Sequence, residues 1–450
     1  MSISSESPAT RRGSGLSSAP SALRSRNFVL FVTGWELNQV AGGLLYFALP
    51  LYVLLETGHP ALMGTVLALA AVPQILLMPM GGVIADRIDK RRFLAGINLA
   101  AAVAVLIWLL TTGTLDVVPA AAVLLLAYLG LEALFSPVFE AAIPALVPED
   151  QLVRANSITS VLGFMSAFGA PALGGVLLAR SGLTLVLAVA VALFSLTAAI
   201  KWFTRIPGVT QPVSGPVVRT FVADLAEAAR YVAKGDHGLG KVLLVDFLVT
   251  FALGPLQFVV LPSILVYAGL NSGQIGWATG ITWGGAAIAV TAVGALAARA
   301  TVRLMRPLVL LAAGAATATG LFFLADLGPA ASAVVMIGGL IVTLGLVAAF
   351  GVLLYSFIGK RVPEHLVGKI FALSGVGSVV GIAAGNLAFG HLMERFADNR
   401  AAVILVAAAI IAAAAVAAST AKDASRSATD TSDASAPQAT DPDPEKAAAP

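Results

Sequence analysis

The feature that most constrains the fold is a series of twelve apolar stretches, each about as long as a membrane is thick. A helix needs about 20 predominantly apolar residues to cross the hydrocarbon core of a bilayer. The stretches occupy residues 28–55, 60–84, 93–113, 119–139, 156–179, 183–203, 242–267, 273–297, 307–326, 330–357, 368–393 and 401–419. Backbone polar groups in lipid must be satisfied within the protein. The pattern therefore predicts an all-α integral membrane protein with twelve transmembrane helices.

Composition and charge agree with a location in the bilayer. Apolar residues make up 58% of the chain and charged residues 11%, whereas soluble proteins carry about a quarter charged residues. The mean hydropathy is +0.92. The absence of cysteine excludes disulfides and thiolate ligands, and the four histidines are scattered over loops and helix ends. We therefore expect no metal site, and the small net charge of +3 indicates no nucleic-acid partner.

The positions of lysine and arginine predict an orientation. Short loops on the cytoplasmic side of a membrane carry an excess of these residues. They cluster before the first stretch and in every second connection after it, whereas Arg180, Arg395 and Arg400 fall on the other side. The sequence therefore predicts a multi-pass protein of the cell membrane with both termini in the cytoplasm.

The chain reads as two related halves. Val147-Pro148-Glu149 recurs as Val362-Pro363-Glu364, 215 residues later, and the same offset places Gly175 on Gly390. Parallel repeats of this kind are typical of transporters with two similar bundles. The predicted organisation is a disordered tail over 1–26, a six-helix bundle over 27–204, a cytoplasmic linker over 205–240, a second, pseudo-symmetric six-helix bundle over 241–419 and a disordered tail over 420–450. Within the linker, residues 218–234 predict an amphipathic surface helix, with a plain solvated helix as the alternative.

The connection between the second and third stretches carries an unusual run of charge. It reads Gly82-Val-Ile-Ala-Asp86-Arg87-Ile-Asp-Lys90-Arg91-Arg92. This run resembles the loop between the second and third helices of the major facilitator superfamily, G-x-x-x-D-R/K-x-G-R/K-R/K. The matching residues are Gly82, Asp86, Arg87, Lys90 and Arg91, and Asp89 stands where the family has glycine. The resemblance implies a cavity between two bundles and a cytoplasmic gate to which this loop belongs, with Glu140 and Arg154 as further gate residues.

Two other motifs narrow the resemblance to one branch of that superfamily. In the fifth stretch, Gly169-Ala170-Pro171-Ala-Leu-Gly174-Gly175 resembles the G-P-x-x-G-G motif of its antiporters, with Ala170 in place of the glycine before proline. The segment 144–157 and the linker segment 225–234 are similar to the macrolide-efflux and siderophore-exporter branch. The likeness covers about residues 35–420. It implies export of a small molecule in exchange for protons.

Two acidic residues inside predicted spans are the candidates for proton coupling, Glu36 near mid-bilayer and Glu132 closer to the cytoplasm. Ionisable groups inside a membrane are costly and mark a pathway or a proton relay. Glu36 lies near the middle of the first stretch with Asn38 and Gln39 beside it. The alternative is a structural acid that is satisfied by hydroxyls or amides of another helix. Glu132 in the fourth stretch is the second candidate, and an ion pair with Arg154 or with an arginine of the charged loop is its alternative.

Four further residues are weaker candidates for the cavity. Asp246 lies close to the cytoplasmic end of its stretch, where an ion pair with Lys241 or another interfacial cation is the alternative. Gln257, Trp283 and Asn386 suit an adaptable apolar pocket, and a lipid-facing position is the alternative for Trp283.

These observations define the expected function. The chain has no phosphate-binding loop, zinc-binding helix motif or nucleophile elbow. We therefore expect a secondary active transporter, not an enzyme, that exports a hydrophobic or amphiphilic small molecule such as a drug, an antibiotic or a secondary metabolite. Protons are the expected coupling ion, no cofactor is expected, and the protein is expected to act as a monomer in the lipid bilayer. A lipid or lysolipid translocator of the same fold and a polytopic membrane enzyme are the alternatives.

Overall fold

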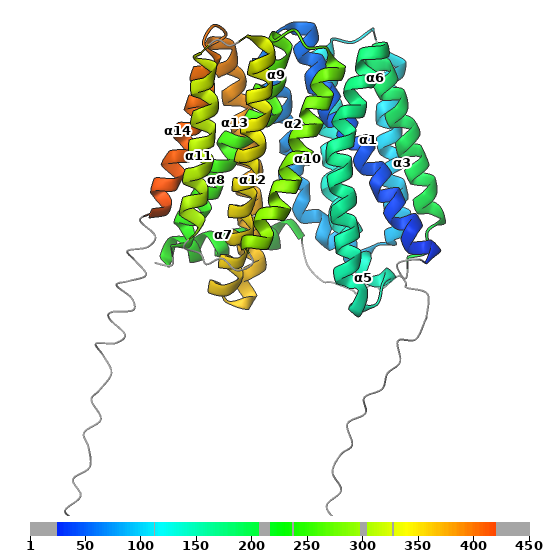
Figure 1. The fold of residues 1–450 in the computed structure, drawn as a ribbon. Coiled ribbons are helices and arrows are strands. Elements are labelled where there is room, and N and C mark those ends of the chain that lie inside the picture. The colour runs from blue at the N-terminus through cyan, green and yellow to red at the C-terminus, as the bar shows by residue number, and fades with distance from the viewer. Residues whose placement is uncertain are drawn as a thin grey trace, which may run out of the picture.

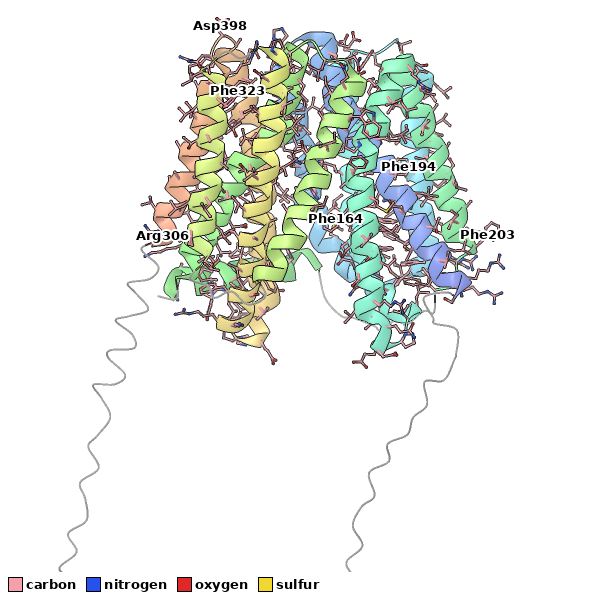
Figure 2. The ribbon with its side chains drawn as sticks, viewed as in Figure 1. Phe164, Phe194, Phe203, Arg306, Phe323 and Asp398 are labelled. Carbon is pink, nitrogen blue, oxygen red and sulfur yellow. The ribbon has the colours of Figure 1, made fainter. Side chains whose placement is uncertain are left out.

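The protein is a bundle of long helices that run side by side between two ends (Figure 1). The computed structural model describes residues 25–111, 113–206, 217–235, 238–297, 304–325 and 328–419, so the predicted tails lie almost wholly outside the described residues. The first helix starts and the last helix ends at the same end of the bundle (Figure 1). We call this end the termini side and the other end the opposite side. Arg306 lies at the termini side and Asp398 at the opposite side (Figure 2).

The predicted stretches fall on helical segments, although not always one stretch to one helix. The first half contains α1 (Arg26–Thr57), α2 (Pro60–Arg87), α3 (Lys90–Thr111), α4 (Val117–Glu140), the short α5 (Ile143–Leu146), a 3₁₀ turn η2 (Glu149–Gln151) and α6 (Leu152–Phe203). The linker forms α7 (Val217–Lys234). The second half contains α8 (Leu239–Pro255), a π-helical segment η3 (Leu256–Val260), α9 (Leu261–Tyr267), α10 (Ser272–Ala297), α11 (Met305–Phe323), α12 (Pro329–Arg361), α13 (Glu364–Arg395) and α14 (Arg400–Ser419).

The prediction of an all-α membrane fold is confirmed. Ten helical segments in the described part of the chain are long and apolar enough to cross a membrane. One of them, α6, contains two predicted spans, because Ser181 and Gly182 leave helical geometry at the opposite side. Gly182 has φ of 65°, a conformation that glycine adopts at low cost. The 26-residue α10 is a further apolar helix. The arrangement is consistent with the twelve predicted spans.

The two halves touch through small residues at the opposite side. In lipid, small side chains let helix backbones approach closely. A Cβ atom on Gly175 of α6 would lie 2.8 Å from the Gly276 Cα of α10, and a Cβ atom on Gly64 of α2 would lie 3.2 Å from the Gly390 Cα of α13. At the same end, the His59 Nδ1 atom lies 2.8 Å from the Glu394 Oε1 atom. These contacts close the opposite side of the bundle.

The linker helix α7 lies across the termini side (Figure 1) and packs against α13, α2 and α8. The Lys369 Nζ atom of α13 lies 2.8 Å from Asp224 Oδ1 and 2.8 Å from Glu227 Oε2 of α7. The hydrogen bond from Lys369 and its positive charge lower the pKa of Glu227. Because this pKa is depressed in the folded protein, the attraction is complete above the ordinary pKa of a glutamate and is lost as the pH falls through the lowered value. The linker helix is therefore attached to the second half at neutral pH.

Candidate substrate cavity

A cavity of about 340 Å³ lies between the two halves. Its walls come from α1, α2, α4 and α6 of the first half and from η3, α9 and α10 of the second. Most of the wall is apolar or aromatic, with Tyr46, Phe47, Tyr128, Phe258 and Trp283 as its large rings. Pockets of this composition bind hydrophobic or amphiphilic molecules, and a few polar groups orient the ligand.

A larger cavity of about 800 Å³ continues toward the termini side. It shares Gln39, Gly163, Ala167 and Trp283 with the smaller cavity. Its outer wall includes the exposed Glu140 and Asn156, which lie at the termini-side ends of α4 and α6. Because the halves are in contact at the opposite side, the two cavities together form a space that is entered from the termini side.

A small polar cluster lies in the wall of the smaller cavity. Asn38 Nδ2 of α1 donates a hydrogen bond to Glu132 Oε2 of α4 over 3.1 Å and another to Gln39 Oε1 over 3.3 Å. The Ser136 hydroxyl, one turn after Glu132, donates to Glu132 Oε1 over 3.0 Å. Gln39 and Glu132 both line the cavity. Among the described residues, Glu132 is thus hydrogen-bonded by neutral groups, in place of the alternative ion pair with Arg154.

Glu36 lies beside this cavity and is not among the residues of its wall. Its carboxylate contacts the hydroxyl of Ser166 on α6, and Ser166 does line the cavity. The Glu36 Oε2 atom is buried and has no hydrogen-bond partner among the described residues. The structure therefore brings the first two predicted acids to the same region of α1, α4 and α6, with Glu132 facing the cavity directly.

The weaker candidates fall in three places. Gln257 and Trp283 line the smaller cavity, so Trp283 is not simply a lipid-facing residue. Asn386 is buried on α13, where its backbone carbonyl packs against Gly64 of α2, and it contributes to the closed opposite side. Asp246 of α8 accepts hydrogen bonds from the hydroxyls of Ser374 over 3.0 Å and Ser378 over 2.8 Å. An ion pair of Asp246 with Lys241 stays a prediction.

The charged connection is a break of two residues between α2 and α3. Gly82, Asp86 and Arg87 form the end of α2, and their side chains lie outside the described part of the structure. Lys90 and Arg91 begin α3, and the Arg91 guanidinium lies 5.4 Å from the centre of the Trp202 ring. Asp89, at the position of the family's glycine, accepts a hydrogen bond from the Arg92 backbone N–H over 3.2 Å. Asp89 thus caps the start of α3, which gives the departure a structural role.

The proline-glycine motif of α6 forms part of the wall and part of the contact between the halves. Pro171 lines the smaller cavity. Gly174 packs against α1, where an added Cβ would lie 3.3 Å from the Leu44 side chain. Gly175 meets Gly276, whereas a Cβ on Gly169 would meet no atom within 4 Å. Within the motif, Pro171, Gly174 and Gly175 thus lie at the cavity or at helix contacts, whereas Gly169 does not.

One buried cation behind the cavity was not predicted as an interior residue. Lys201, in the last turn of α6, is fully buried and donates a hydrogen bond to the Phe31 carbonyl over 2.7 Å. Its ammonium lies 3.9 Å from the centre of the Phe31 ring and 5.2 Å from that of Phe139, within range of a cation–π attraction. The sequence contained the signal, because Lys201 lies inside the sixth apolar stretch and not beyond its end.

The comparisons with known proteins identify the class. Residues 37–386 match the Major Facilitator Superfamily, and the chain belongs to that family. It is 28% identical to the enterobactin exporter EntS of Salmonella choleraesuis (strain SC-B67) over 78% of this chain and 82% of that protein. It is 27% identical to macrolide efflux protein A of Streptococcus pyogenes over 51% of this chain and 56% of that protein.

Solved structures agree with the fold. The nucleoside transporter NupG superposes with a TM-score of 0.69 at 14% identity, over 88% of this chain and 99% of that chain. A bacterial homologue of the human lysosomal transporter Spinster, solved in an inward-facing, unoccupied state, gives a TM-score of 0.69 at 15% identity, over 88% of this chain and 96% of that chain. Family, relatives and structures are all transporters, so the protein is a multi-pass membrane transporter and not an enzyme.

Proposed function

We propose that the protein is a proton-coupled exporter of a hydrophobic or amphiphilic small molecule. The observation that carries this proposal is the cavity between the halves, which combines aromatic walls with a carboxylate, Glu132, that is held by neutral partners. A carboxyl group in that setting can bind a proton or a cationic group of the substrate, but not both at once. Competition between the two gives exchange of substrate for protons. The functions of two relatives, export of enterobactin and efflux of macrolides, support the direction of transport.

The state of the structure fits one half of an alternating-access cycle. The opposite side is closed by glycine contacts, and the cavity is open toward the termini side. Rocking of the two halves about the cavity would open the opposite side and close the termini side. In this proposal one copy of the chain performs the cycle in the cell membrane, with protons as the coupling ion and no other cofactor.

The termini side is proposed to be the cytoplasmic side. Lysine and arginine are concentrated there, and such residues are retained in the cytoplasm. Reporter fusions at residue 210 and after the last residue should both give a cytoplasmic signal. An external signal from either fusion would contradict the proposed orientation.

Transport in proteoliposomes tests the function itself. A panel of amphiphilic dyes and antibiotics is loaded outside vesicles whose lumen is more acidic than the medium. Exchange of protons for substrate should drive at least one compound into the lumen, and collapse of the pH gradient should stop its accumulation.

A lipid or lysolipid translocator of the same fold is the second candidate, favoured by the apolar walls of the cavity. It would instead move a fluorescent lysolipid between leaflets at the same rate with and without the pH gradient. That result, without accumulation of any panel compound, would replace the export proposal.

A further inference from the structure

The seam between α6 and α10 is closely packed toward the opposite side and hollow toward the termini side. Toward the opposite side, the two backbones touch at Gly175 and Gly276, and Gly280 packs against the Phe168 carbonyl. The next glycine, Gly284, meets the Phe168 ring, where an added Cβ would lie 3.3 Å from a ring carbon. Beyond this point, toward the termini side, Ala287 and Ile288 of α10 line a hollow between the two helices.

This hollow is a third one, in addition to the two central cavities. It has a volume of about 600 Å³ and is lined by Val161, Phe164, Met165 and Phe168 of α6 and by Gly284, Ala287 and Ile288 of α10. All seven residues are apolar. Met165 and Ile288 are 60% and 73% exposed. They lie in spans and line neither of the two central cavities, so the surface that they expose faces bilayer hydrocarbon. We call this hollow the lateral groove.

Phe164 separates the lateral groove from the interior. It is the residue that belongs to both linings, because it also lines the larger cavity. On one face of α6, Ser160, Gly163 and Ala167 line the cavity; on the adjacent face, Val161 and Met165 line the groove. Phe164 stands between these faces, on the part of α6 that borders α10 (Figure 2). One aromatic side chain therefore forms the partition at this place.

The two sides of Phe164 match the two parts of an amphiphilic molecule. The groove offers contacts to hydrocarbon alone, whereas the cavity behind Phe164 offers the amides of Gln39 and Asn156 and the carboxylate of Glu140. We infer that the α6–α10 seam is a lateral entrance, through which a substrate dissolved in the leaflet on the termini side inserts its polar head past Phe164 while its alkyl or aryl tail occupies the lateral groove. This inference rests on the proposed function and adds the route and the class of substrate, a membrane-dissolved amphiphile.

The first test asks whether position 164 meets both environments, and it does not require transport. The chain contains no cysteine, so a single introduced thiol can carry a bimane fluorophore. Phe164→Cys is compared with Ser160→Cys on the cavity side and with Leu196→Cys in the second span of α6. Leu196 is 50% exposed, close to the 45% of Phe164. Aqueous iodide should quench positions 160 and 164, and doxyl-labelled lipid should quench positions 164 and 196. Quenching of position 164 by one reagent alone would overturn the inference.

The second test asks whether the tail uses this route. A rhodamine ethyl ester and a rhodamine hexadecyl ester share a head group and differ in the tail. Attachment of a bulky maleimide at Phe164→Cys should reduce transport of the hexadecyl ester several-fold and leave the ethyl ester much less affected, whereas the same maleimide at Leu196→Cys should change neither. Equal effects on the two esters, or none on the hexadecyl ester, would overturn the route. Failure of the unmodified protein to transport either ester would contradict the proposed function, and the quenching pattern would still decide whether the seam is an entrance.

Discussion

The Glu132→Gln variant is expected to fold and to keep the substrate binding that the apolar walls of the cavity provide, but to lose pH-driven accumulation. Glutamine has nearly the shape of glutamate, and its carbonyl can still accept the hydrogen bond that Asn38 donates. It cannot bind and release a proton in the transport cycle. Each proton that crosses a potential of 100 mV contributes about 2.3 kcal/mol, which sustains a concentration ratio of about 50-fold. Loss of the coupling proton should therefore reduce accumulation by about that factor per 100 mV.

Two comparisons make the result specific. Exchange of labelled for unlabelled substrate should persist in Glu132→Gln, because exchange needs no net proton movement. Glu149→Gln, the same change at an exposed position on the termini side, should accumulate substrate as the parent does. If Glu132→Gln also accumulates substrate like the parent, Glu132 is a structural acid. Glu36, with its unpaired buried oxygen, is then the residue to test by the same substitution.

The Gly175→Leu variant is expected to be unable to close the opposite side of the bundle. A Cβ atom at this position would meet the backbone of α10 at Ser272 and Gly276, and backbone cannot move aside as a side chain can. Overpacking of a tight contact costs about 1–3 kcal/mol, enough to shift an equilibrium between two conformations by about fivefold to more than a hundredfold. The bundle should therefore favour a conformation in which the opposite side is open.

Accessibility of an introduced thiol measures this shift. A cysteine at Thr279, which lines the smaller cavity, should react with a membrane-impermeant maleimide from the opposite side faster in Gly175→Leu than in the otherwise unchanged protein. Gly314→Leu is the matched control, because a Cβ on Gly314 of α11 would meet no atom within 4 Å. Unchanged reactivity in Gly175→Leu, with normal transport, would show that this glycine contact does not close the bundle.

The helices could be predicted from sequence because the membrane imposes one simple rule, a run of about 20 apolar residues for each span. The predicted stretch 60–84 became α2 (Pro60–Arg87), and the predicted linker helix 218–234 became α7 (Val217–Lys234). The π-helical turn at η3 could not be predicted, since it is a local adjustment within a span. It carries Gln257, whose Nε2 atom is buried without a hydrogen-bond partner among the described residues.

The arrangement of the site could be predicted less well from the sequence. Acidic residues stand out within apolar stretches. Glu36 and Glu132 could therefore be identified from the free-energy cost of an ionisable group in a membrane. Their partners come from other helices: Asn38 reaches Glu132 across 94 positions of the chain. Tertiary packing of that kind leaves no periodic trace in the sequence. The buried position of Lys201 could not be predicted for the same reason, because its partners Phe31 and Phe139 belong to α1 and α4.

Proton movement driven by substrate tests the coupling most directly. Proteoliposomes that contain the protein and a transported dye, with equal pH inside and outside, are diluted into dye-free medium while a lumenal indicator reports pH. Exchange of substrate for protons predicts that the lumen acidifies as dye leaves, in either orientation of the protein, and that Glu132→Gln abolishes the acidification. Dye efflux from the parent with no change in lumenal pH would contradict proton-coupled export.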